Sequence, residues 1–253
     1  MEKRIYSWLP DIPDHRDFTY SVAKAVLKAL PPKVDLSPLC PPVYDQGQLG
    51  SCTGNAIAGS IEYEQLKKKD PHAFMPSRLF IYYNERLLEG TVKQDAGAMI
   101  RDGMKSVNAQ GVCNESTWPY NIVKFKNKPT VKAYKEAKKY TTKVYSRVAQ
   151  DLNSLKGCLA SGDPFVFGFT VYESFESATV AKTGIAPMPA PNEKVLGGHA
   201  VLCVGYDDTA KSFIVRNSWG SGWGKKGYFT LPYDYLTNND LADDFWVIKD
   251  VNI

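Results

Sequence analysis

Cys52 has a sequence context that favours nucleophilic chemistry. It follows the glycine-rich stretch QGQLGS, and small and apolar residues follow it at once. This pattern predicts a helix that begins near Cys52, with Ser51 as its cap. A helix N-terminus has unpaired N–H groups and about half a positive charge, which favour a thiolate over a thiol. Because the thiolate is the reactive form, Cys52 is the candidate nucleophile.

His199 and Asn217 are the candidate partners of this thiol. They flank two β-rich runs around the polar turn from Asp207 to Lys211, a pattern typical of a β-hairpin. Each lies nine residues from Asp208, so antiparallel pairing brings both to the same end of the hairpin. His199 would take a proton and give it to a leaving amine, and Asn217 would orient the ring without adding negative charge.

Two further side chains complete the expected site. Gln46 precedes the glycine loop, and its amide N–H is the candidate oxyanion donor beside the backbone N–H of Cys52. Trp219 lies two residues after Asn217 and is expected to shield the bond between Asn217 and His199 from water.

The elements that position these residues divide the chain by composition. Helices are expected at PSRLFIYYNERLLEG and AGAMIRDGMKSVNAQG, and a buried strand at DPFVFGFTVY. Residues 1 to about 33 are rich in proline and charge, which predicts a segment draped over the body of the protein.

The sequence resembles the papain-like (C1-type) cysteine peptidases from about residue 31 to residue 230. The segments that carry the resemblance are VDLSPLCPPVYDQG, GSC at 50–52, GVCNESTWPY, GGHAVLCVGYD and RNSWGSGWGKKGYF. His199 lies 147 residues and Asn217 165 residues after Cys52, close to the spacing of roughly 130–150 residues in that family. The resemblance implies a cysteine endopeptidase that acts through a thioester acyl-enzyme, with Cys52, His199, Asn217 and Gln46 as its catalytic residues.

The resemblance also implies the fold and its division. The fold would be α+β, with a helical left lobe, an antiparallel β-barrel-like right lobe and the active-site cleft between them. Residues 1–33 would be a prosegment or a retained plug over the cleft, residues 34–130 the left lobe and residues 131–253 the right lobe.

Substrate contacts follow from the same resemblance. Gly97 and Ala98, within DAGAM, match the place where substrate backbone pairs with the enzyme. Gly198 would offer its carbonyl to the substrate, and Trp219 would line the leaving-group side. Residues 242–244 match the floor of the pocket for the P2 side chain of the substrate, where an acidic floor would favour a basic residue.

The sequence departs from the family pattern in several places. Leu49 stands where a disulfide cysteine is usual, and Thr53 stands where tryptophan is common. The long propeptide of lysosomal members is missing from this sequence. These departures predict a divergent branch, similar to microbial enzymes with a short N-terminal prosegment.

Composition limits the other classes. The apolar fraction is 43%, the net charge is +4, and no apolar run is long enough to span a membrane. No secretory signal peptide is visible, so the compartment stays open: cytoplasmic, exported by another route, or exported with a leader that this sequence lacks. Of the five cysteines, Cys158 and Cys203 are expected in the core, and Cys40 and Cys113 could pair in an oxidising compartment. No cysteine spacing indicates zinc.

Partners follow from this reading. We expect polypeptide substrates, the chain's own N-terminal segment as an inhibitor, no metal or organic cofactor, no nucleic acid, no membrane, and a monomer. The alternatives are a same-fold exopeptidase, amidase or transpeptidase, a catalytically silent binding scaffold, or nucleic-acid binding through eight lysines between Lys124 and Lys143. The natural substrate, its P2 residue, the pH optimum and any cleavage of residues 1–33 are not determined by the sequence.

Overall fold

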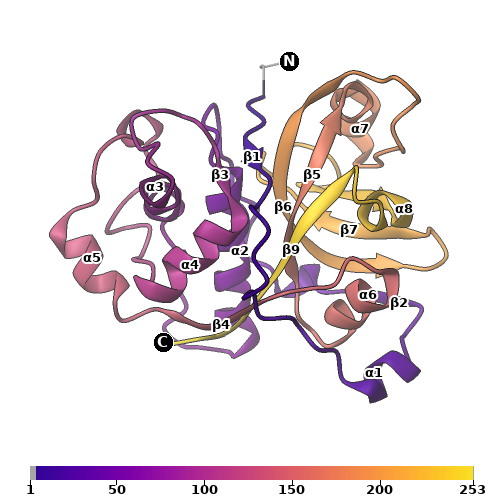
Figure 1. Ribbon diagram of the computed structural model, residues 1–253, viewed down its shortest axis with the longest axis horizontal. Coiled ribbons are helices and arrows are strands. Elements are labelled where there is room, and N and C mark those ends of the chain that lie inside the picture. Colours follow the sequence, from indigo (N-terminus) through magenta and orange to yellow (C-terminus); the bar gives the residue numbers. More distant parts are fainter. Residues whose placement is uncertain (1–3, 253) are drawn as a thin grey trace.

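The helices between residues 52 and 137 lie in one half of the molecule, the antiparallel sheet lies in the other half with the helices between residues 152 and 237, and the N-terminal segment runs along the junction (Figure 1). The computed structural model describes residues 4–252, and the predicted α+β class is confirmed. The helices are α1 (Lys24–Lys28), α2 (Cys52–Lys67), α3 (Arg78–Leu88), α4 (Ile100–Ala109), α5 (Val131–Ala137), α6 (Leu152–Ala160), α7 (Ala178–Thr183) and α8 (Tyr233–Thr237). The strands are β1 (Trp8–Leu9), β2 (Lys33–Asp35), β3 (Ala98–Met99), β4 (Thr142–Arg147), β5 (Phe165–Tyr172), β6 (Val195–Asp207), β7 (Ser212–Arg216), β8 (Tyr228–Pro232) and β9 (Ala242–Val251).

The larger sheet has the strand order β4-β9-β5-β6-β7-β8, and β2 pairs with β6. Every pairing in it is antiparallel. Among the described residues, β4 and β8 are the two ends of this path, so the sheet does not close on itself. The sequence predicted a barrel-like lobe, and this lobe is an open antiparallel sheet.

The predicted hairpin is confirmed as β6 and β7. Asp207 pairs with Ser212 across the turn, and Leu202 pairs with Arg216 near the far end. A register shift between Cys203 and Gly205 adjusts the pairing. His199 and Asn217 therefore lie at the same end of the hairpin, where β6 packs against α2.

Helix α2 begins at Cys52, as predicted, and is buried on nearly all sides. Its small residues permit this: a Cβ on Gly54 would lie 2.8 Å from the backbone oxygen of Arg78 in α3. The capping prediction for Ser51 was wrong in detail. Ser51 holds the N-cap position, but no side-chain cap bond forms, because its hydroxyl bonds Tyr120 and Asn55. The N–H groups that open α2 therefore keep no side-chain cap.

Helix α3 has the boundaries that the sequence predicted. Ser77 caps it by accepting a hydrogen bond from the backbone N–H of Phe80 at 3.2 Å, and Gly90 follows its end with φ +72°. Both α3 and α4 pack near α2, so the helical half of the molecule fixes the start of α2.

The N-terminal segment drapes over the body, as its composition predicted. Strand β1 pairs in parallel with β3, with Trp8 opposite Ala98. Further along, the backbone N–H of Tyr20 donates to Arg147 of β4 at 2.8 Å. The prosegment role of residues 1–33 stays a prediction, and Met1 to Lys3 lie outside the described residues.

Other sequence expectations concern cysteines and surfaces. All five cysteines are free thiols, so Cys40 and Cys113 do not pair; Cys158 and Cys203 are buried as expected. The eight lysines between Lys124 and Lys143 are exposed. Within residues 4–252, no helix has both the length and the apolar character needed to cross a bilayer.

Candidate active site

The Cys52 sulfur lies at the junction of the two halves, beneath the N-terminal segment. Its side chain is 1% exposed, and the hydroxyl oxygen of Ser7 lies 3.9 Å from the sulfur. Burial raises the pKa of the Cys52 thiol, while the backbone N–H of Ala200, the Ser7 hydroxyl and the backbone N–H of Thr53 act against that rise. Ala200 follows His199 directly, so the hairpin end meets the start of α2 at this sulfur.

The two hairpin residues contact each other directly. The Nε2 atom of His199 lies 2.9 Å from Oδ1 of Asn217. That oxygen also accepts the backbone N–H of Ser218, so it acts as an acceptor and Nε2 carries the proton. Nδ1 of His199 is buried and has no hydrogen-bond partner in the described part of the chain. The nitrogen that could exchange a proton with a reacting group is therefore Nδ1.

Trp219 covers the imidazole from one side. Its ring stacks on that of His199 with centroids 4.9 Å apart and planes 20° apart. Burial is the main reason that the pKa of His199 falls to about 4, while the Asn217 bond raises it and the Arg4 charge lowers it. Arg4 itself lies over the Trp219 ring, 4.9 Å from its centroid. In this covered state both the thiol and the imidazole favour their neutral forms, whereas the sequence predicted a thiolate at Cys52.

Gln46 is held beside the start of α2 by three hydrogen bonds. Its Nε2 donates to the carbonyl of Leu49 at 3.0 Å, and its Oε1 accepts the hydroxyl of Ser218 at 2.6 Å. Its backbone N–H donates to the carbonyl of Ser218 at 2.9 Å. Ser218 lies between Asn217 and Trp219, so the Gln46 amide is tied to the hairpin end as well as to the glycine loop.

The residues expected to bind substrate backbone instead meet the N-terminal segment. The N–H of Ala98 donates to the carbonyl of Ser7 at 3.2 Å. Gly97 has φ +77°, and a Cβ there would lie 1.7 Å from the Ser7 oxygen. On the opposite side, a Cβ on Gly198 would lie 2.7 Å from the carbonyl oxygen of Trp8. The segment thus occupies the space in which an extended polypeptide was expected.

The Trp8 side chain fills a pocket that the sequence did not reveal. A Cβ on Gly168 would lie 2.0 Å from the indole ring, so this glycine in β5 makes the space. The indole N–H donates to Oδ2 of Asp244 at 3.2 Å, which places an acidic residue of the predicted 242–244 floor against the ring. Trp8 could have been noticed as a large aromatic residue in a polar, proline-rich segment, but its destination depends on contacts distant in sequence.

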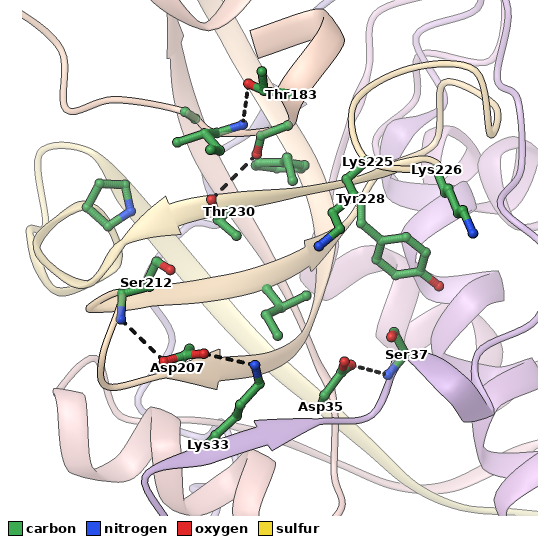
Figure 2. A pocket seen from close by; sticks show the side chains of 17 residues that line it. Lys33, Asp35, Ser37, Thr183, Asp207, Ser212, Lys225, Lys226, Tyr228 and Thr230 are labelled. Carbon is green, nitrogen blue, oxygen red and sulfur yellow. Dashed lines mark hydrogen bonds and ion pairs between the residues drawn. The ribbon is translucent and has the colours of Figure 1, made fainter.

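A separate cavity lies away from these residues. Figure 2 shows this cavity, which is lined by residues of β2, β7 and β8, the end of α7 and the turn between β6 and β7. Its volume is about 780 Å³. Lys33, Asp207 and Tyr228 are among its lining residues, and none of the four candidate catalytic residues is. In the described residues, no cluster of three or more histidine, cysteine or acidic side chains could hold a metal ion.

A buried thiol at a helix start and a paired histidine on a hairpin are the arrangement that the sequence predicted for a cysteine protease, and the comparisons with known proteins show the same class. The sequence model of the papain family of cysteine proteases matches residues 30–245. An uncharacterised peptidase C1-like protein of Acanthamoeba polyphaga mimivirus is 44% identical over 98% of this chain and 88% of its own. The crystal structure of xylellain, a cysteine protease from Xylella fastidiosa, superposes with a TM-score of 0.93 at 51% identity, covering 96% of this chain and 95% of that one.

The chain belongs to the papain family and is a cysteine protease. The fold predicted from the sequence is likewise confirmed. The digestive procathepsin L 3 of Tenebrio molitor shares that fold, with a TM-score of 0.72 at 21% identity over 92% of this chain and 73% of its own.

Proposed function

We propose that the protein is an endopeptidase in which Cys52, His199, Asn217 and Gln46 carry the reaction. The observation that supports this most directly is the bond between His199 and Asn217 at the hairpin end that meets the start of α2. Asn217 fixes the ring so that Nδ1 serves the thiol. A protein built only to bind would have no need for a buried imidazole with one nitrogen left unpartnered.

The reaction follows from these positions. Nδ1 of His199 takes up the proton of the Cys52 thiol, the sulfur forms a bond to the carbonyl carbon of the substrate, and the electron pair of the carbonyl moves to its oxygen. The Gln46 amide and the backbone N–H of Cys52 stabilise that oxyanion. When the C–N bond breaks, His199 donates its proton to the leaving amine. Water then attacks the thioester while His199 takes up a proton, and the acid product leaves with the thiol restored.

The path of the N-terminal segment favours an endopeptidase over an exopeptidase. Arg4 lies against Trp219 on one side of the sulfur, Ser7 lies at the sulfur, and Trp8 continues into the pocket on the other side. A chain can therefore pass the sulfur and extend in both directions. An aminopeptidase or a carboxypeptidase binds a terminus of its substrate, so its groove would be blocked on one side of the sulfur. The path of the segment therefore makes these two exopeptidase activities the weaker alternative.

The same segment is the proposed inhibitor of the enzyme. The Ser7 hydroxyl oxygen lies 3.9 Å from the sulfur and donates to the carbonyl of Gly50, and the carbonyl oxygen of Ser7 accepts the N–H of Ala98. The Ser7 carbonyl is held by Ala98, whereas the Gln46 amide donates to Leu49, so the segment can cover the site without placing this carbonyl at the oxyanion donor. Sequencing the N-terminus after incubation at several pH values would show whether the segment is cleaved or retained.

Labelling with an epoxysuccinyl thiol-protease inhibitor tests the nucleophile, with Cys52→Ala as the control. We expect labelling of the parent chain and none of the variant. Equal labelling of both would remove Cys52 from the mechanism. Digestion of peptide libraries, read by mass spectrometry, would then separate internal cleavage from terminal cleavage, and terminal cleavage alone would overturn the endopeptidase assignment.

A further inference from the structure

Arg78 is a buried cation beside the loop that carries Gln46. It is the first residue of α3, and it is 7% exposed. Nη1 of Arg78 donates to the backbone carbonyl of Asp45 at 3.0 Å, and Nη2 donates to the carboxylate of Glu115 at 2.7 Å. Asp45 directly precedes Gln46 in the chain. The guanidinium therefore holds the loop one residue before the candidate oxyanion donor.

Two tyrosine rings lie against the same guanidinium. The Cζ atom of Arg78 lies 5.0 Å from the ring centroid of Tyr44 and 4.0 Å from that of Tyr120. The Tyr120 hydroxyl donates to the carbonyl of Gln46 at 2.9 Å. A planar guanidinium suits this place because its faces stack on aromatic rings while its edge donates hydrogen bonds. Gln46 is thus supported on both sides, through the carbonyl that precedes it and through its own carbonyl.

The second oxyanion donor, the backbone N–H of Cys52, is tied to the same side chain. Nη1 of Arg78 also donates to Oδ1 of Asn55 at 3.2 Å. The side-chain amide of Asn55 in turn donates to the backbone carbonyl of Ser51 at 2.9 Å. That carbonyl and the N–H of Cys52 belong to one planar peptide unit, so a bond that fixes the carbonyl also fixes the direction of the N–H.

Glu115 compensates the charge of Arg78 and fixes the place of its guanidinium. Its Oε2 accepts the backbone N–H of Arg78 at 3.1 Å, while its Oε1 accepts the side chain. A buried ion pair is weak evidence for stability, because apolar residues of similar volume often serve the fold as well. The bonds of Arg78 to the Gln46 loop and to Asn55 instead indicate a role at the site.

We propose that Arg78 is a positioning residue for the reaction: its guanidinium holds the Gln46 amide and the Cys52 N–H in the directions that the oxyanion requires. The inference rests on the proposed function of Cys52 and Gln46. Arg78 acts only through the loop before α2 and through the first turn of α2. Donors that are already aligned stabilise an oxyanion more than donors that must reorient during the reaction.

Two reactions of the same thiol separate this role from an effect on the thiol itself. Peptide hydrolysis passes through an oxyanion, whereas iodoacetamide alkylates the sulfur by displacement of iodide at a saturated carbon and forms no oxyanion. In Arg78→Met we expect kcat to fall by about 10–100-fold, with a smaller change in KM. Mass spectrometry of the peptide that contains Cys52 should show alkylation within about twofold of the parent rate, because this reaction needs no oxyanion donor.

Arg78→Lys tests the geometry of the guanidinium. Lysine keeps the positive charge, but it lacks the planar fork that reaches Asp45, Asn55 and Glu115 together. We therefore expect this variant to restore only part of the lost kcat.

Lys156→Met is the matched control, because Lys156 is also a buried cation that contacts a tyrosine ring and an acid. Its Nζ lies 4.7 Å from the ring centroid of Tyr206 and 2.7 Å from Oδ1 of Asp208, in the sheet half. This variant should lower the free energy of unfolding in urea and leave kcat unchanged. If Arg78→Met does not fold, the double variant with Arg78→Met and Glu115→Gln, which leaves no unpaired carboxylate, provides the same test.

Two outcomes would overturn the inference. An unchanged kcat in a folded variant would show that the two donors need no support from Arg78. Equal losses of kcat and of the alkylation rate would show that Arg78 acts on the Cys52 thiol or on the fold. Both outcomes differ from a failure of the proposed function, in which the parent chain itself would hydrolyse no peptide.

Discussion

Two regions meet at the Cys52 sulfur, and different forces hold them. Helix α2 and strand β6 share one hydrophobic core, in which Ile57 and Leu202 are fully buried. The covering segment places the Trp8 indole in the cleft and packs the Tyr6 ring against His199 and Trp219, and it also uses hydrogen bonds and ion pairs. Other apolar side chains of the segment are largely exposed, among them Ile12 at 68% and Phe18 at 72%.

This difference shows how a protease can be covered without being deformed. Removing the segment costs the Trp8 contact and a set of polar contacts that water can replace. Separating α2 from β6 would open a core of apolar side chains, at roughly 25 cal/mol for each Å² exposed. The core between α2 and β6 therefore fixes the positions of the candidate catalytic residues. The N-terminal segment, whose polar contacts water can replace, controls access to them.

The largest expected effect is on the rigid side. Cys52→Ala removes the sulfur and should reduce peptide hydrolysis by at least about 10⁴-fold, because loss of a covalent nucleophile leaves only binding and oxyanion stabilisation. Protection of the Ala98 amide from hydrogen exchange should not change, since Ser7 keeps its bonds to Ala98 and Gly50. Hydrolysis that persists at the parent rate would show that the chemistry lies elsewhere.

A second test asks whether the amide tied to Ser218 acts in the transition state. Gln46→Ala should lower kcat/KM by about 2.7–4 kcal/mol of transition-state stabilisation, or roughly 10²–10³-fold, with most of the loss in kcat. Gln46→Glu is the matched control of similar shape. A loss in both variants that appears only in KM would assign Gln46 to substrate binding.

Sequence reasoning succeeded where local signals determine the position of a residue. The small residues after Cys52 fixed the start of α2, and the nine-residue spacing about Asp208 placed His199 beside Asn217. It failed where distant contacts decide. Nothing near Trp8 specifies Gly168, and nothing near Asp11 specifies Asp244. The protonation states of Cys52 and His199 also depend on tertiary contacts. Burial raises the pKa of the Cys52 thiol and lowers the pKa of the His199 imidazole, so both favour their neutral forms.

A third test weakens the cover alone. Trp8→Ala removes the indole from the Gly168 pocket, and truncation of a buried tryptophan costs about 3–5 kcal/mol. Docking should weaken by about 100-fold or more, so the full chain should hydrolyse peptides faster and lose protection at Ala98. Phe18→Ala, an exposed aromatic of the same segment, is the control and should change neither. Lower activity in Trp8→Ala, with a folded body, would mean that the segment assists the reaction.

The smallest effect concerns how the start of α2 is held. If Ser51 acted as a helix cap, Ser51→Ala would cost about 1 kcal/mol whatever residue stood at position 120. In the structure the Ser51 hydroxyl bonds that of Tyr120, which donates to the carbonyl of Gln46 at 2.9 Å. We therefore expect Ser51→Ala and Tyr120→Phe to be coupled by about 0.5–1.5 kcal/mol in a double-mutant cycle of urea unfolding. Additive losses would instead make the two hydroxyls independent, and the start of α2 would then be held by packing alone.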